Sequence, residues 1–67
     1  MTVEAWIARD KDGRLEIFTT YPQKNRKENF WVGEMLLYDD DKHKFPDIDW
    51  NDDFAKHVEI TINELPQ

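Results

Sequence analysis

Residues 6–18, WIARDKDGRLEIF, constrain the fold more than any other part of the chain. Two half-apolar runs flank the turn Asp10-Lys11-Asp12-Gly13. Aspartate suits the first position of a type I turn, and glycine suits the left-handed position that follows as a bulge. The stretch therefore predicts a tight N-terminal hairpin with a positive φ angle at Gly13.

The apolar residues of the two runs select one register for this hairpin. The bulged turn places Ile7 opposite Ile17 and Trp6 opposite Phe18. The competing register would set two arginines side by side and Ile7 against a glutamate, which the pattern disfavours. Large apolar side chains then lie on both faces, so we expect a second layer, or a curled sheet, to cover the side with Trp6 and Phe18.

Two later segments are predicted to form further strands. Residues 57–62 alternate between polar and apolar, with three residues predicted to face inward, Val58, Ile60 and Ile62. Residues 30–38 begin with β-prone side chains, whereas their second half is also compatible with a helix. Gly33 favours a kinked strand or two short strands that meet there.

Two connections of opposite charge join these segments. Residues 21–29 are polar, begin near a proline and carry an excess of basic side chains, which predicts a solvated loop. Residues 39–53 contain seven Asp against two Lys, and their apolar residues predict a loop pinned to the core by its aromatics. At most one helical turn, capped by Asn51, is expected near residues 50–54. These charges predict a bipolar molecule.

The pattern as a whole predicts one mostly-β domain over residues 1–67. We expect an antiparallel sheet of four or five strands, either open or curled into a partial barrel. Three Trp, four Phe and two Tyr supply the core in a chain that has no cysteine for disulfides. The chain has neither a signal-peptide pattern nor an apolar run of about 20 residues, so we expect a cytoplasmic protein outside the membrane.

The residue types present argue against catalysis and metal binding. The chain has no serine and no cysteine, and its threonines lack a nucleophile context. The Asp clusters at residues 10–13 and 47–52 depart from the calcium-loop pattern in their glycine and distal glutamate positions. His43 and His57 lack the helical spacing of a metal-binding pair. We therefore expect no enzyme, no cofactor and no metal.

The acidic connection and two tryptophans form the candidate site. Carboxylates beside aromatic rings suit a basic protein partner, because charge speeds encounter and rings supply affinity. Burial in a small aromatic core is the alternative for both tryptophans. The candidate partner-binding residues are Trp31, Asp39, Asp40, Asp41, Asp47, Asp49, Trp50, Asp52 and Asp53.

These features give two functional hypotheses. The first is a non-enzymatic protein-binding or accessory module whose partner is an unidentified protein of basic character. The second is an acidic nucleic-acid mimic that inhibits a DNA- or RNA-binding protein, although seven Asp in one loop make a short mimic. The net charge of −6 argues against direct nucleic-acid binding. We expect a monomer or a weak dimer formed through an edge strand.

The ARDKDG hairpin at residues 8–13, the Phe45-Pro46 pair with Trp50, and the strand at residues 58–62 also carry a resemblance. On these residues the chain resembles small proteins of gut Bacteroidales and of their phages or mobile elements. The resemblance implies a short, stand-alone intracellular protein. It implies no particular activity and no catalytic residues.

Overall fold

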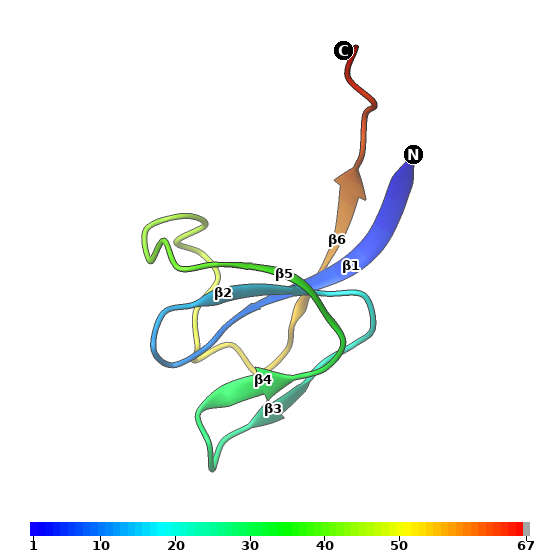
Figure 1. Cartoon of the computed structure of the whole chain (residues 1–67). Coiled ribbons are helices and arrows are strands. Elements are labelled where there is room, and N and C mark those ends of the chain that lie inside the picture. The colour runs from blue at the N-terminus through cyan, green and yellow to red at the C-terminus, as the bar shows by residue number, and fades with distance from the viewer. Residues whose placement is uncertain (67) are drawn as a thin grey trace.

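The computed structural model describes residues 1–66 and contains strands but no helix among them. The strands are β1 (Thr2–Arg9), β2 (Leu15–Phe18), β3 (Gln23–Asn25), β4 (Phe30–Val32), β5 (Met35–Asp39) and β6 (Lys56–Thr61). Four of them form an antiparallel sheet in the order β5-β2-β1-β6, and β3 and β4 form a two-stranded sheet (Figure 1). The predicted mostly-β fold is confirmed, as an open sheet with a small second sheet and not as a closed barrel.

The N-terminal hairpin has the predicted register. Trp6 pairs with Phe18, and Ile7 pairs with Ile17. The turn closes through a 3.0 Å hydrogen bond from the Gly13 amide to the Asp10 carbonyl, and Gly13 has a φ of 100°. A positive φ costs glycine little, so the local sequence and the long-range pairing agree on this turn.

Gly33 separates β4 from β5, which confirms one of the two forms predicted for residues 30–38. The chain changes sheets at this glycine, because β4 pairs with β3 whereas β5 pairs with β2. A Cβ atom at Gly33 would lie 3.1 Å from Cδ1 of Phe18 and 3.2 Å from Cα of Pro22. Glycine therefore allows the close approach between the two sheets.

The segment of residues 21–29 is more ordered than the sequence predicts. It contains β3, and Pro22 just before this strand is among the most buried side chains. β3 is short and polar, so its sequence has no apolar alternation that would reveal it. Its pairing with β4 is decided by residues that follow it in the chain.

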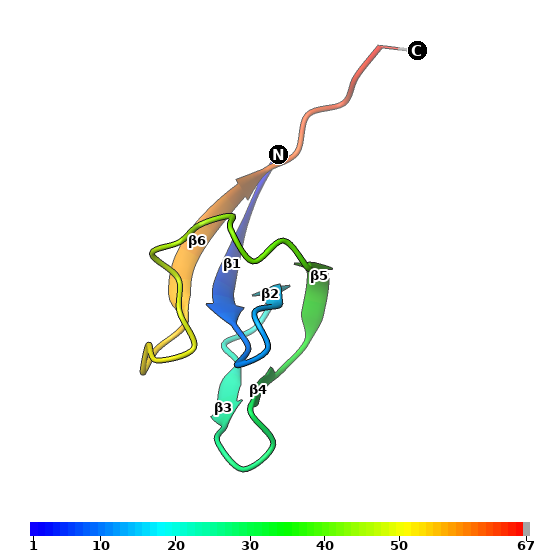
Figure 2. The same cartoon turned by 90° about the vertical axis from the view of Figure 1, so that its left-hand side faces the viewer.

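The core has two parts, one on each face of the four-stranded sheet. One buried cluster consists of Ala8, Phe18, Trp31 and Ala55. The other consists of Ile7, Leu15 and Ile48. The second layer predicted over Phe18 is therefore the β3–β4 hairpin, which lies beneath the main sheet in Figure 2.

Two predictions for the long loop need correction. Residues 50–54 form no helical turn; instead, the Asp52 amide donates to the Asp49 carbonyl at 3.1 Å in a hydrogen-bonded turn. Phe45 is exposed, so Ile48 and the half-buried Trp50 hold the loop to the core.

The C-terminal strand is partly as predicted. Val58 and Ile60 are half-buried, whereas Ile62 lies beyond β6 and is exposed. The physical reason is that β1 and β6 extend past the other strands as a two-stranded ribbon, where no second layer covers them (Figure 1).

Candidate binding surface

Contacts within the chain hold the aspartates of the acidic loop. Four carboxylates form ion pairs: Asp39 with Lys44 at 2.7 Å, Asp40 with Arg14 at 3.0 Å, Asp47 with Lys56 at 3.1 Å and Asp53 with Arg26 at 3.3 Å. Three others accept hydrogen bonds from backbone amides of the same loop: Asp41, Asp49 and Asp52. These pairs are exposed and individually weak. The four ion pairs nevertheless hold their carboxylates against different segments of the chain, so the carboxylates do not form one patch.

The ion pairs also lower the pKa values of two carboxylates. Hydrogen bonding to the Lys44 ammonium lowers the pKa of Asp39, and the Lys56 ammonium does the same for Asp47. Both groups are therefore charged over the whole neutral range, and each is partly neutralised by its lysine. The predicted acidic surface is thus less negative than its sequence indicates.

The buried side chain of Arg9 anchors the acidic loop. Its Nε donates to the Ile48 carbonyl and its Nη1 to the Gly13 carbonyl, both at 2.7 Å. Further acceptors are the backbone carbonyls of Asp41, Lys44 and Phe45. A guanidinium group offers five N–H donors in a rigid fork, which suits this ring of carbonyls. The sequence reasoning missed this role, because backbone acceptors leave no pattern in the sequence.

Trp31 belongs to the core and not to a binding surface. Its side chain is 4% exposed, its backbone amide donates to Oδ1 of Asp10 at 2.8 Å, and its indole Nε1 donates to the Arg9 carbonyl at 3.2 Å. These bonds fasten the β3–β4 hairpin to the end of β1. The assignment of Trp31 to the partner-binding set is therefore corrected.

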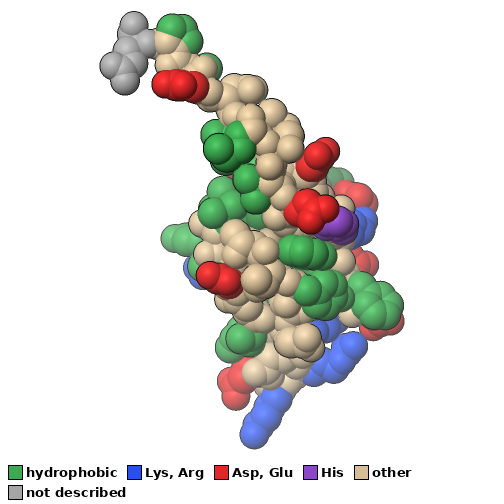
Figure 3. Space-filling view, turned by 90° about the vertical axis from the view of Figure 1, so that its right-hand side faces the viewer, with side chains coloured by type: hydrophobic (Ala, Val, Ile, Leu, Met, Phe, Trp, Pro, Cys, Tyr) green, Lys and Arg blue, Asp and Glu red, His purple; other side chains and the backbone are tan. Residues whose placement is uncertain are grey.

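Trp50 is half-buried and is held by a lysine of strand β3. Nζ of Lys24 lies 4.3 Å from the centroid of the Trp50 ring, and it donates to the carbonyls of Trp50 and Asp52. Together with the Arg26–Asp53 ion pair, this contact joins the β3–β4 hairpin to the acidic loop. Figure 3 shows Lys and Arg side chains gathered at the end opposite the C-terminus. Two cations of the β3–β4 hairpin already have partners, Lys24 in backbone carbonyls and Arg26 in the Asp53 carboxylate.

Glu16 is a buried acid in the core between the two hairpins. It is 8% exposed, and among residues 1–66 its Oε1 finds no hydrogen-bond partner. Burial, then hydrogen bonding and repulsion by Asp10, raise the pKa of Glu16 to about 8. Glu16 is therefore mostly protonated at neutral pH, and it was not singled out by the sequence reasoning.

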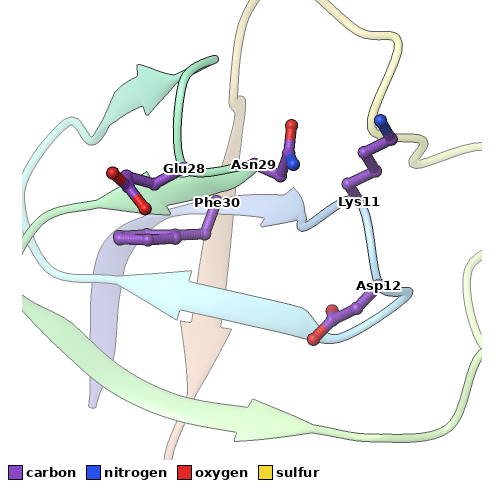
Figure 4. A pocket seen from close by; sticks show the side chains of 5 residues that line it. All are labelled: Lys11, Asp12, Glu28, Asn29 and Phe30. Carbon is purple, nitrogen blue, oxygen red and sulfur yellow. The ribbon is translucent and has the colours of Figure 1, made fainter.

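Two shallow hollows lie on the surface. One of about 320 Å³ separates the two hairpin tips and is lined by Lys11, Asp12, Glu28, Asn29 and Phe30. Figure 4 shows these side chains spreading apart instead of converging on one point. The other, of about 250 Å³, is lined by Glu4, His57, Val58 and Glu59. No cluster of three or more potential metal ligands occurs in the described part of the chain.

An apolar segment is exposed along the edge strand β5. Its residues Met35, Leu36, Leu37 and Tyr38 are 45–52% exposed. β5 is a terminal strand of the sheet order, so its outer edge has no strand partner within residues 1–66 (Figure 2). Open edges are templates for strand pairing, and no proline or charged residue interrupts these four positions. The sequence predicted a strand here but not its place at the edge.

The function of the chain has to be inferred from its own surface, because known proteins offer no match. No protein-family model, no curated protein and no solved structure matches the chain. Among residues 1–66 there is also no helix with the length and apolar character needed to cross a membrane.

Proposed function

We propose that the chain is a non-enzymatic protein-binding module that receives an extended segment of a partner protein along the open edge of β5. The observation that carries this proposal is the run of half-exposed apolar residues on an unpartnered edge strand. In strand addition, backbone hydrogen bonds supply affinity and the alternating side chains supply specificity. β5 offers both kinds of contact.

The opposite edge of the sheet is less suited to this role. β6 carries four exposed polar or charged side chains along its length, Lys56, His57, Glu59 and Thr61. Charged side chains on an edge strand discourage pairing with other chains. Both edges are open, but they differ in chemistry, and β5 is the one that suits an apolar partner strand.

The alternative function, an inhibitor that mimics nucleic acid, has less support. A mimic needs carboxylates spaced like phosphates along one extended face. Here four carboxylates are paired with cations from different parts of the chain: the β1–β2 turn, the β3–β4 turn, the acidic loop itself and β6. Protein binding through an apolar edge requires no such regular array.

Affinity capture from a lysate of cells that produce the protein tests the edge directly. The wild type is compared with Leu37→Lys, which places a charge on β5, and with Thr61→Lys, which makes a matched change on β6. We expect a protein retained by the wild type and by Thr61→Lys but lost with Leu37→Lys, with circular dichroism confirming that each variant is folded. Retention of the same proteins by all three, or of none over a range of salt concentrations, would contradict the proposal.

A further inference from the structure

Resting on the function proposed above, we infer that the segment that pairs with β5 is apolar in its centre and carries Lys or Arg at both ends. The inference follows from the charges that flank β5. Glu34 precedes the strand and is exposed, and Asp39 ends it, followed by the exposed Asp40. An incoming strand of about seven residues spans this distance, since both strands rise about 3.4 Å per residue.

The two ends of β5 attract cations to different degrees. Asp39 and Asp40 are already paired with Lys44 and Arg14, whereas Glu34 forms no ion pair within the described residues. The backbone carbonyl of Glu34 accepts a hydrogen bond from the Thr19 amide at 2.9 Å. The Glu34 side chain is exposed to solvent. A basic residue opposite Glu34 therefore gains the most, because opposite charges in cross-strand positions stabilise a sheet.

The centre of the edge selects an apolar segment. Met35 to Tyr38 are half-exposed, and successive side chains of a strand lie on opposite faces. A partner strand with apolar residues therefore covers apolar surface of β5 on both faces of the sheet. A polar partner strand would cover the same apolar surface of β5 but would not form the apolar side-chain contacts that stabilise the pairing.

The same charges argue against a second copy of this chain as the occupant. If two β5 strands pair antiparallel about Leu36 and Leu37, Glu34 of each faces Asp39 or Asp40 of the other. Like charges in these positions destabilise the pairing at both ends.

Two synthetic peptides test the partner chemistry on the full-length protein. The first is Lys-Val-Thr-Val-Thr-Val-Lys, and the second has Glu in place of both Lys; both are acetylated and amidated. Each is titrated into isotope-labelled protein, and amide chemical shifts report the site and the affinity. We expect the lysine peptide to shift β5 and β2 amides and to bind about fivefold or more tightly than the glutamate peptide, a factor that high salt reduces.

Two protein variants locate the charge effect. Glu34→Lys should weaken the lysine peptide by about three- to fivefold. Glu59→Lys makes the same charge change on β6 and should leave the affinity unaltered. Equal binding of both peptides at β5 would overturn the basic chemistry and leave the proposed function standing. No shift along β5 with either peptide at millimolar concentration would overturn both, and a dimer with its β5 amides protected would assign the edge to a second copy.

Discussion

Gly13 is the residue whose replacement tests the hairpin most directly. Its φ of 100° is strained for any residue that carries a Cβ atom. Gly13→Ala should therefore lower the free energy of unfolding by about 1 kcal/mol or more, as measured by urea denaturation. A Cβ atom would also lie 2.8 Å from Cγ of Lys42, which is a flexible side chain. The double variant Gly13→Ala/Lys42→Ala should keep most of the loss; full recovery would attribute it to the clash instead.

Arg9 is the residue that couples the hairpin to the acidic loop. Arg9 is 7% exposed and its guanidinium donates to several backbone carbonyls, so a lysine there cannot reach the same acceptors. We expect Arg9→Lys to lower the free energy of unfolding by on the order of 3 kcal/mol and to speed hydrogen exchange in residues 40–48. Arg14→Lys, which alters an exposed ion pair, is the control and should cost about 1 kcal/mol or less. Similar losses for both variants would argue against the anchoring role.

Glu16 should make stability fall as the pH rises. The pKa of Glu16 is about 8 in the folded protein and 4.5 for an ordinary glutamate, so between these pH values the folded protein holds a proton that the unfolded chain has released. The contribution of Glu16 is complete below pH 4.5 and is lost as the pH passes 8. Glu16→Gln should remove a slope of up to about 1.4 kcal/mol per pH unit in this window, measured by denaturation at several pH values. Glu28→Gln, an exposed change, should retain the slope, and parallel profiles for wild type and Glu16→Gln would rule the effect out.

Among the elements, the β1–β2 hairpin could be predicted from sequence because its apolar pattern and its turn residues select the same register. β3 could not, since a polar three-residue strand depends on the later β4 for its pairing. The orientations of Trp31 and Trp50 were likewise undetermined, because periodicity within a short strand or loop does not say which surface the rest of the chain covers. The negative charge of the acidic candidate site is partly neutralised by cations that lie far away in the sequence, such as Arg14 and Lys56, and sequence alone does not show these pairings.

The attachment of the β3–β4 hairpin is the element-scale prediction. Trp31 is nearly fully buried and Trp6 is only half-buried, although both pack on the same cluster. Trp31→Ala should cost about 3–5 kcal/mol, enough to unfold so small a domain, whereas Trp6→Ala should cost less and leave a folded protein. Thermal unfolding followed by circular dichroism ranks the two variants. The reverse ranking would mean that the hairpin is not held by Trp31.

At the scale of the whole molecule, stability should be uneven along its 44 Å length. Arg9, Trp31 and Ile48 tie the end of β1 to the hairpin and the loop, while the ribbon of β1 and β6 projects beyond the second layer. An uncovered two-stranded ribbon is marginally stable, and poorly packed regions open locally without global unfolding. Amides in the outer ribbon, residues 2–4 and 59–61, should therefore exchange faster than those of residues 6–9.

A matched pair of substitutions tests this gradient by equilibrium unfolding. Ile7 is buried in the body against Ile48, whereas Ile60 is half-buried in the ribbon opposite Val3. Ile7→Ala should cost about 2–5 kcal/mol because it opens a cavity between sheet and loop, and Ile60→Ala should cost less than about 1.5 kcal/mol because solvent refills the space. Equal costs would mean that the ribbon is packed as tightly as the body.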